Sequence, residues 1–192
     1  MQVYKFGGAS IATPERMRAL LPIIEETTDP LTLVVSALGK TTNALEVVVD
    51  AACKGKKTEA HELAKKLEND HLEYARALLS DENYEEAQKA LAVFFTELQW
   101  AIDDASMEKT DYSYDQIVCM GELFSTRIFS LFLQQQGLKF EWVDVRDVIR
   151  TDDTYRDARV DWAYTEESAT RIMGSILADG KNIITQGFIG AT

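Results

Sequence analysis

The chain has 192 residues, enough for one well-buried domain, and its hydrophobic fraction of 46% is that of a globular protein. A formal net charge of −12, from 32 acidic against 20 basic residues, argues against nucleic acid or an anionic membrane surface as the main partner. The two cysteines, Cys53 and Cys119, support neither a disulfide framework nor a zinc ligand set. A cytoplasmic location is expected, because the N-terminus lacks a basic-then-apolar signal pattern and no apolar run approaches the roughly 20 residues of a membrane span.

The N-terminus carries the first predicted strand, a short β-type run over residues 3–6 that ends at Gly7 and Gly8. Paired glycines let a backbone approach a ligand closely and present bare N–H groups. Lys5 and Ser10 add a positive charge and a hydroxyl suited to phosphate. One interpretation is a phosphate-binding loop at the end of this strand. The other is a plain β-turn beside a surface lysine, and this stretch alone does not decide between them.

A βαβ unit is predicted from the residues that follow. Thr-Pro-Glu at 13–15 has the N-cap, first-turn proline and acidic residue of a helix start, and Pro22 should kink that helix near its end. Asp29 and the proline after it should then break the chain before an apolar strand over 31–35. The crossover should be right-handed and the two strands parallel, so the glycine pair and Ser36 fall at the same edge of the sheet, where open α/β sheets bind ligands.

The next stretch, from Thr42 to about Lys109, has no strand-like run and is rich in Ala, Leu, Glu and Lys, which predicts a helical insertion. Asp81 is the predicted N-cap between its two main helices. Two stripes of apolar residues at helical spacing predict packing against the core. Their members are Leu63, Leu67, Leu72, Ala75, Leu78 and Leu79, and then Ala87, Ala90, Leu91, Phe94, Phe95 and Leu98.

The remaining residues alternate between helices and strands. A strongly apolar helix is predicted over 115–136, with Gly137 as its C-cap. Further predicted elements are strands at 140–143, 148–149 and 182–186, a polar loop at 151–161 and a helix at 166–177.

The loop after the second strand contains Gly-Lys-Thr at 39–41, which superficially suggests a Walker A loop. That motif needs a glycine five residues before Gly39, and the residue there is Val34, inside the strand. The better interpretation is a small-residue loop over 36–43 that offers hydrogen-bonding groups beside the first loop, with Lys40 in solvent rather than catalytic.

Glu122 follows Gly121 near the start of the most apolar helix. A buried carboxylate is costly unless it is paired. Glu122 could receive the ammonium group of a ligand where Gly121 leaves room, or it could form an internal salt bridge or cap; the spacing supports both equally.

Two further sets of polar residues carry weaker signals. The aspartates at 152, 153 and 157 lack the glycine and the distal glutamate of an EF-hand loop, so a solvated loop is favoured over a calcium site. His61 and His71 lie ten residues apart in a charged helical region, which is neither a metal-ligand spacing nor a catalytic triad, and both are expected at the surface.

Taken in order, these segments resemble the N-terminal part of the aspartokinases, which are members of the amino acid kinase family. The resemblance extends over all 192 residues. One departure is Ala9, where the family more often has threonine. The segments that carry the resemblance are Lys5-Phe-Gly-Gly-Ala-Ser10, Val34-Val-Ser-Ala37 with Thr42-Asn43, Gly121-Glu122-Leu123 with Ser125, Val143-Asp-Val-Arg146, Arg150-Thr-Asp152 and Thr185-Gln-Gly-Phe-Ile-Gly190.

The resemblance implies an α/β fold of the three-layer αβα amino acid kinase (carbamate kinase-like) type, with a mostly parallel sheet. Residues 1–192 would form a truncated N-terminal, amino-acid-binding lobe of the kinase domain, with a helical insertion over 43–111. The family's Gly-Arg-Gly-Gly-Ser-Asp-like segment, nucleotide lobe and regulatory ACT domains have no counterpart in these residues. The piece is therefore expected to be inactive alone.

The implied reaction is transfer of the γ-phosphoryl group of ATP to the β-carboxylate of L-aspartate, which gives 4-phospho-L-aspartate for lysine, threonine and methionine synthesis. By this resemblance Lys5 is the catalytic residue and binds the ATP phosphates together with Gly7, Gly8 and Ser10. Mg²⁺ would accompany ATP, although no dedicated metal ligand is recognised. Phosphoryl transfer depends mainly on positioning and charge stabilisation, which these groups provide.

The same resemblance assigns aspartate binding to Ser36, Thr42 and Glu122, with Glu122 accepting the α-ammonium group. No general base is required, because a side-chain carboxylate with a reference pKa of about 3.9 is already an anionic nucleophile at neutral pH. A homo-oligomer is expected for the full-length enzyme.

Two alternatives remain open on the sequence. One is another member of the amino acid kinase family, acting on glutamate or acetylglutamate, although the Lys-Phe-Gly-Gly-Ala-Ser form and the long helical insertion favour aspartate. The other is a non-catalytic ligand-binding or helical interaction module in which Lys5 and Glu122 are structural.

Overall fold

The computed structural model describes residues 1–28 and 30–192, so Asp29, part of the predicted chain break, lies outside the described residues. At its centre is a four-stranded, wholly parallel sheet with the strand order β1-β2-β4-β3. The parallel pairing of the first two strands confirms the predicted βαβ unit. The strands are β1 (Gln2–Phe6), β2 (Leu31–Val35), β3 (Phe140–Trp142) and β4 (Asn182–Gln186).

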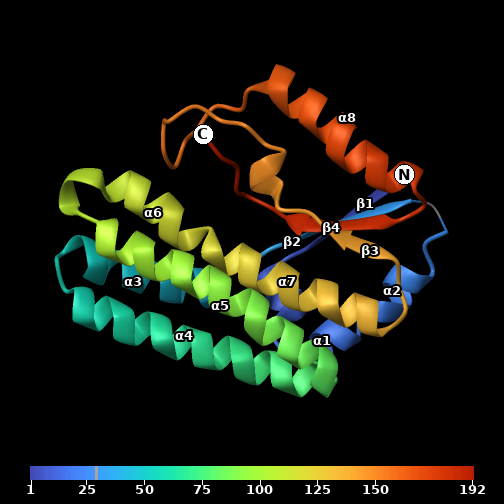
Figure 1. The fold of residues 1–192 in the computed structure, drawn as a ribbon, viewed down its shortest axis with the longest axis horizontal. Helices are drawn as coiled ribbons and strands as arrows, with labels where there is room; N and C mark the ends of the chain where they lie inside the picture. Colours follow the sequence, from blue (N-terminus) through green and yellow to red (C-terminus); the bar gives the residue numbers. More distant parts are fainter. Residues whose placement is uncertain (29) are drawn as a thin grey trace.

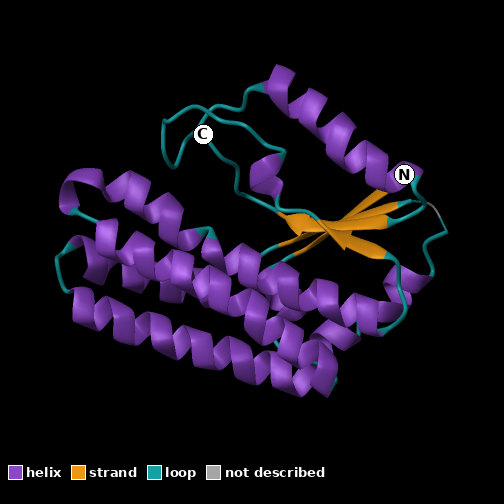
Figure 2. Cartoon of the chain, in the orientation of Figure 1, coloured by secondary structure: helices purple, strands orange, loops and turns teal. Residues whose placement is uncertain are grey.

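Helices cover both faces of the sheet, as Figures 1 and 2 show. Helix α8 lies along one face, and α7 lies on the other with the remaining long helices stacked outside it. This is the predicted three-layer αβα arrangement. The helices are α1 (Pro14–Arg18), α2 (Leu21–Glu25), α3 (Thr41–Cys53), α4 (Lys57–Leu78), α5 (Asp81–Asp104), α6 (Thr110–Val118), α7 (Met120–Gln135) and α8 (Trp162–Ala178), with short 3-10 turns η1 (Gly8–Ile11), η2 (Met107–Lys109) and η3 (Val145–Asp147).

The hydrophobic core is continuous from the sheet through α7 to the outer helices, because α7 is apolar on nearly every side. Phe6 of β1 packs against Phe129 of α7 with ring centroids 6.5 Å apart. On the outer side of α7, Phe124 stacks on Phe95 of α5 at 4.2 Å. Both predicted apolar stripes of α4 and α5 face this core.

His71 contradicts its predicted surface position. Its side chain is only 3% exposed and lies 5.0 Å from the Phe124 ring, while its Nδ1 lies 2.7 Å from the Leu67 carbonyl oxygen. The charged residues around it in sequence occupy the outer side of α4, and His71 occupies the inner side. His61 lies at the surface as predicted, half-exposed and paired with Asp103 at 2.8 Å.

Some helix boundaries differ from the prediction for local reasons. The first predicted helix is two, α1 and α2, and Pro22 lies at the start of the second rather than the end of the first, because a proline is tolerated in a first turn. Helix α5 has Ser80, not Asp81, at its N-cap position. The long helix predicted over 115–136 is divided at Cys119 into α6 and α7.

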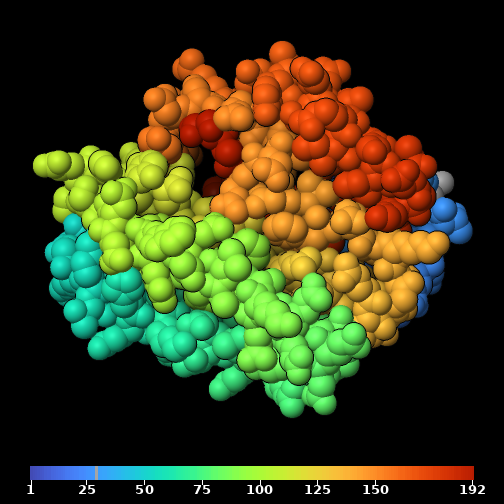
Figure 3. Space-filling view, in the orientation of Figure 1, coloured from blue at the N-terminus to red at the C-terminus, as the bar shows by residue number. Residues whose placement is uncertain are grey.

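Two more differences concern the last third of the chain. Residues 148–149 do not form a strand; the chain there leaves η3, and isolated bridges follow it, between Arg150 and Ala191 and between Thr151 and Val160. Helix α8 begins at Trp162, four residues before the predicted start, since the Asp161 carboxylate accepts the Tyr164 N–H as an N-cap. Figure 3 shows the C-terminal residues (dark red) beside the loop that leads into α8 (orange), as the bridge requires.

One helical stretch, Met107–Gln135, has the length and apolar composition of a membrane-crossing helix. Its most apolar window is 83% buried inside the domain. The core helix of a folded domain passes the same test, and this burial accounts for the apolar composition.

Candidate functional site

The site begins where the glycine loop after β1 meets the loop after β2. The Gly8 carbonyl accepts the Gly39 N–H at 3.1 Å, and a Cβ built on Gly8 would lie 2.4 Å from the Ala37 carbonyl oxygen. Only glycine fits there, because that distance is far inside van der Waals contact. Gly7, by contrast, has open space where its Cβ would be. The glycine loop therefore packs on the second loop through Gly8 and remains open at Gly7.

Lys5 lies one residue before this loop. Because side chains alternate along a strand and Phe6 faces α7, Lys5 is on the opposite face of the sheet, in register with Val34 and Thr185. Its side chain is exposed at the end of β1. An exposed ammonium at a strand end is available to an anionic ligand.

The other predicted phosphate-binding residue, Ser10, is also exposed. It lies in the 3-10 turn η1, and its N–H donates to the Gly7 carbonyl at 2.9 Å. The first two N–H groups of such a turn, those of Gly8 and Ala9, have no partner inside the turn. The loop thus offers main-chain donors together with the Ser10 hydroxyl.

The loop after β2 leads directly into α3. Ser36 donates its N–H to the Phe6 carbonyl at 3.1 Å and accepts the Ser125 hydroxyl at its own carbonyl at 2.9 Å. Thr42 is half-buried in the first turn of α3. Lys40 is exposed at the N-cap position, as predicted. Ser36 and Thr42 therefore lie at either end of a loop that packs on the glycine loop.

Gly121 brings α7 against this same loop. A Cβ there would lie 2.9 Å from the Ala37 Cβ and 3.3 Å from the Thr41 Cγ2. The space beside Gly121 is thus filled by Ala37, Thr41 and Leu45, rather than left for a ligand as the sequence suggested. The glycine instead allows the close approach that places Glu122 beside the end of β2.

Glu122 is 5% exposed, and its Oε1 accepts the Ala37 N–H at 3.4 Å. Its Oε2 is buried and has no hydrogen-bond partner among the described residues, and Glu122 forms no ion pair within that part of the chain. The internal salt bridge considered from the sequence is therefore not found. Such an oxygen is costly to bury and can accept a bond from a ligand.

Electrostatics agree with this geometry. Burial raises the pKa of Glu122 from 4.5 to about 7, while the Ala37 N–H and the positive charge of Lys5 act in the opposite direction. The Lys5 and Glu122 side chains therefore interact electrostatically at this edge of the sheet. A cation bound beside Glu122 would stabilise the ionised carboxylate further.

All seven predicted site residues lie on three connected segments at this edge. Lys5, Gly7, Gly8 and Ser10 are on the first loop, Ser36 and Thr42 on the second, and Glu122 on α7. Direct contacts connect the segments: Gly8 with Ala37, and Ala37 with Glu122.

Sequence reasoning missed the polar groups that support this arrangement. The Ser125 hydroxyl bonds the carbonyls of both Ser36 and Glu122, and the Thr126 hydroxyl also donates to the Glu122 carbonyl, at 2.8 Å. Their role could have been suspected from the sequence, because Ser125 and Thr126 are adjacent hydroxyl residues in a strongly apolar helix. Such residues need hydrogen-bond partners when they are buried.

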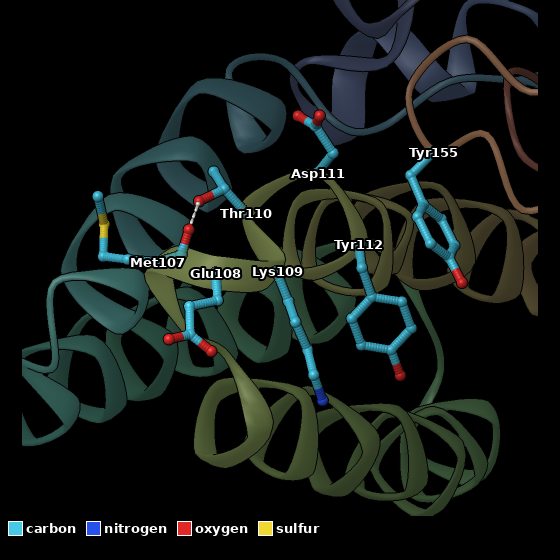
Figure 4. Close-up of a pocket in the computed structure, with 7 residues that line it drawn as sticks. All are labelled: Met107, Glu108, Lys109, Thr110, Asp111, Tyr112 and Tyr155. Carbon is cyan, nitrogen blue, oxygen red and sulfur yellow. Dashed lines mark hydrogen bonds between the residues drawn. The ribbon is translucent and has the colours of Figure 1, made fainter.

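A cavity of about 630 Å³ lies elsewhere, between the start of α6 and the loop over 151–161. Figure 4 shows its two tyrosines side by side, and their ring centroids are 5.2 Å apart. Neither the glycine loop nor Glu122 contributes to it. It is lined by Met107, Glu108, Lys109, Thr110, Asp111, Tyr112 and Tyr155.

Within residues 1–28 and 30–192, no three histidine, cysteine or acidic side chains are grouped so as to hold a metal ion. The Asp152 carboxylate instead accepts the N–H groups of Thr154 and Arg159, at 3.1 and 3.0 Å, and so shapes its own exposed loop. This agrees with the solvated loop predicted there.

The sequence is similar to a known protein family and to proteins within it. The model of the amino acid kinase family matches residues 1–192. Lysine-sensitive aspartokinase 3 of Escherichia coli is 29% identical over 189 residues, which are 98% of this chain and 40% of that protein. Aspartokinase 1, chloroplastic, of Arabidopsis thaliana is 30% identical over 198 residues, 98% of this chain and 33% of that protein.

Solved aspartokinase structures share the fold of this chain. E. coli aspartokinase III in complex with lysine and aspartate (T-state) matches with a TM-score of 0.85 and 27% identity, over 98% of this chain and 41% of that one. The same enzyme in complex with aspartate and ADP (R-state) matches with a TM-score of 0.74 and 30% identity. The chain thus spans between one third and about two fifths of the length of these relatives. The family match over the whole chain and the shared fold lead to one conclusion: this chain belongs to the amino acid kinase family.

Proposed function

We propose that this chain is part of an aspartate kinase, an enzyme that transfers the γ-phosphoryl group of ATP to the β-carboxylate of L-aspartate. The observation that carries the proposal is Glu122, a buried carboxylate with an unpartnered oxygen at the sheet edge that also holds Lys5 and the glycine loop. The similarity to aspartokinases, including one solved with aspartate and ADP, supports this substrate pair.

Aspartate would bind at the α7 side of the site. Its α-ammonium group suits the free Oε2 of Glu122, because an ammonium carries three donors and a positive charge that offsets the buried carboxylate. Ser36 and Thr42, at the ends of the neighbouring loop, would hold the carboxylate groups through their hydroxyls, since the Ser36 N–H is already bonded to the Phe6 carbonyl. The first turn of α3 adds a partial positive charge that favours an anion.

The ATP phosphates would bind at the β1 side. The open space at Gly7 and the main-chain donors of the loop fit phosphate oxygens, and the exposed Lys5 and Ser10 side chains border it. Mg²⁺ bound to ATP would neutralise part of the phosphate charge. Lys5 would stabilise the additional charge on the transferring group, which is the main requirement of this reaction.

The residues need not move a proton. An oxygen of the aspartate β-carboxylate forms a bond to the γ-phosphorus while the bond from that phosphorus to the departing ADP oxygen breaks. The nucleophile is already ionised at neutral pH. The role of this chain is therefore to align the two substrates, with Glu122 and Thr42 fixing one and the Lys5 loop fixing the other.

Wider assignments follow from the same proposal. Residues 1–192 would form the amino-acid-binding lobe, with 43–111 as its helical insertion. The enzyme would act in the cytoplasm as a homo-oligomer, and its product would serve lysine, threonine and methionine synthesis. Both cysteines are free thiols, which suits a reducing compartment.

Isothermal titration of this chain with L-aspartate tests the proposal. Wild-type protein should bind aspartate, and Glu122→Gln should weaken binding at least tenfold, since an amide cannot neutralise the ammonium group. The matched control is Glu141→Gln, which alters a half-exposed glutamate of β3 that is paired with Lys181 at 3.0 Å and lies level with Thr32, near the start of β2 rather than its end. It should leave binding unchanged.

Two outcomes would count against the proposal. Equal weak binding of aspartate and glutamate would favour another member of the family. No binding of either amino acid by folded wild-type chain would favour a non-catalytic module.

A further inference from the structure

A buried polar network lies along α7 beside the aspartate site proposed above. Its centre is Thr126, fully buried, one turn after Glu122. The Thr126 hydroxyl lies 2.8 Å from the Glu122 carbonyl oxygen, 3.0 Å from the Trp142 Nε1 of β3 and 2.8 Å from the Gln186 Nε2 of β4. We call these three side chains, Thr126, Trp142 and Gln186, the Thr126 network.

The hydrogen-bonding capacity of the Thr126 hydroxyl is completely used. A hydroxyl has one proton to donate and two lone pairs to accept with. Its proton points to the Glu122 carbonyl at 2.8 Å, with the Leu123 carbonyl as a more distant acceptor at 3.4 Å, and its lone pairs receive the Trp142 and Gln186 N–H groups. Gln186, itself 2% exposed, accepts the Val145 N–H at its Oε1 at 2.7 Å. Each polar side-chain atom of the Thr126 network therefore has a hydrogen-bond partner among the described residues.

The network joins three elements that are far apart in the sequence. Thr126 is on α7, Trp142 at the end of β3 and Gln186 at the end of β4. Apolar contacts are not directional, whereas the bonds of a saturated buried hydroxyl each require a particular distance and angle, so they define the position of the helix more sharply. The sheet thereby fixes the main chain of α7 at the Glu122 carbonyl.

That carbonyl belongs to the residue whose side chain faces the site. The first turn of α7 is also tied to the loop after β2, by the Ala37 N–H on the Glu122 carboxylate and by the Ser125 hydroxyl on the Ser36 carbonyl. The loop after β2 thus holds the Glu122 carboxylate. The sheet, through Thr126, holds the Glu122 main chain.

We propose that Thr126, through the bonds of the Thr126 network, is the positioning residue that sets where the Glu122 carboxylate lies at the amino-acid site. This inference rests on the proposed function for the identity of the ligand, but the positioning itself does not require it. Thr126 touches no substrate, and it acts through the helix turn it shares with Glu122.

The chain supplies a matched control on the same helix. Ser130, one turn further along α7, is fully buried and also carries a hydroxyl, but that hydroxyl has no hydrogen-bond partner among the described residues. Replacing it removes a buried oxygen from α7 without breaking any bond of the network.

The experiment compares four variants with the wild-type chain. Thr126→Val keeps the shape and removes every bond of the hydroxyl, Thr126→Ser keeps the hydroxyl, Ser130→Ala is the control, and Trp142→Phe removes one donor and keeps an aromatic ring. Two readouts are measured for each: the dissociation constant for L-aspartate, and the titration midpoint of the Glu122 carboxyl carbon by NMR, with Glu122→Gln used to assign the signal.

Thr126→Val should weaken aspartate binding about tenfold, the usual effect of losing a buried bond of this kind. The Glu122 midpoint, expected at about 7 in the wild type, should rise by about half a unit or more as the carboxylate moves from the Ala37 N–H. Trp142→Phe should shift both readouts in the same direction but less. Thr126→Ser and Ser130→Ala should match the wild type.

The inference is overturned if Thr126→Val and Ser130→Ala leave the Glu122 midpoint equally unchanged. If Thr126→Val fails to fold, the Trp142→Phe variant is used instead. A Glu122 titration midpoint equal to that of the wild type in Trp142→Phe then overturns the inference. If wild-type chain binds no aspartate while the midpoint still moves in Thr126→Val alone, the proposed function fails and the positioning role stands.

Discussion

The main-chain N–H of Ala37 donates to Oε1 of Glu122 across 3.4 Å, which joins the loop after β2 to the first turn of α7. The other carboxylate oxygen, Oε2, is buried and has no hydrogen-bond partner among the described residues. Burial in such a position raises the pKa of the carboxyl group above its value in water. A bound cationic ligand would lower that pKa again.

Glu122 should therefore make the stability of the chain depend on pH. Its pKa is raised from 4.5 to about 7, so the stabilisation by the protonated form is complete below about pH 4.5 and is lost as the pH rises to about 7. The loss attributable to this group is at most about 3 kcal/mol. Urea unfolding at several pH values should show wild type losing stability relative to Glu122→Gln over this window. Parallel curves would contradict the assignment.

His71 should have the opposite dependence. Burial lowers its pKa below 6.5, with the Leu67 carbonyl bond and the Asp70 charge opposing, so its stabilisation is present above pH 6.5 and is lost as the pH falls through the lowered folded pKa. His71→Ala should also cost roughly 2–4 kcal/mol at pH 7.5, because it leaves a cavity beside Phe124.

The control for His71 is His61, which is half-exposed. His61→Gln should change the free energy of unfolding by no more than about 0.5 kcal/mol and keep the acid sensitivity. Acid unfolding followed by circular dichroism measures both. A His71→Ala protein as acid-sensitive as the wild type would show that the sensitivity arises elsewhere.

The two glycines after β1 should respond very differently to alanine. Gly8→Ala places a methyl 2.4 Å from the Ala37 carbonyl oxygen, a backbone atom that cannot move aside cheaply, and should cost roughly 1–3 kcal/mol. Gly7→Ala meets open space with a φ of −79°, which suits any residue, and should cost no more than about 0.5 kcal/mol. Thermal unfolding of both variants checks this. Equal losses would disprove the close approach.

Gly121 and Ala37 should be energetically coupled. Gly121→Ala places its new Cβ 2.9 Å from that of Ala37, which would push α7 from the loop after β2. Ala37→Gly should relieve part of that clash, so a double-mutant cycle should give a coupling of about 1 kcal/mol in favour of the double variant. Additive losses in the cycle would mean that other neighbours, such as Leu45, dominate the contact.

Local patterns predicted the elements on which the site is built. The β-type runs located β1, β2 and β4, of which β1 and β4 end at glycines, and the helix-start signal at Thr13 located α1. Gly137 was found as the stop of α7, and its φ of +76° explains why a glycine is needed there. Such features depend on a few neighbouring residues, so the sequence reveals them directly.

The predictions that failed depended on partners distant in sequence. His71 was placed at the surface because its neighbours are charged, but Phe95 and Phe124 bury it. Residues 148–149 were predicted as a strand from their apolar character, yet they pack in a loop under α8. Whether an apolar or polar residue is buried is a property of the assembled layers.

The sequence by itself determined the family resemblance, the parallel βαβ start and the seven residues of the candidate site, because each lies in a short motif with its own chemistry. Only the tertiary structure decided that Ala37 meets both Gly8 and Glu122, that Gly121 serves packing rather than ligand space, and that Thr126 joins α7 to the ends of β3 and β4. The reason is physical: these contacts join residues up to 85 positions apart in the chain, as between Ala37 and Glu122, and no local pattern encodes them.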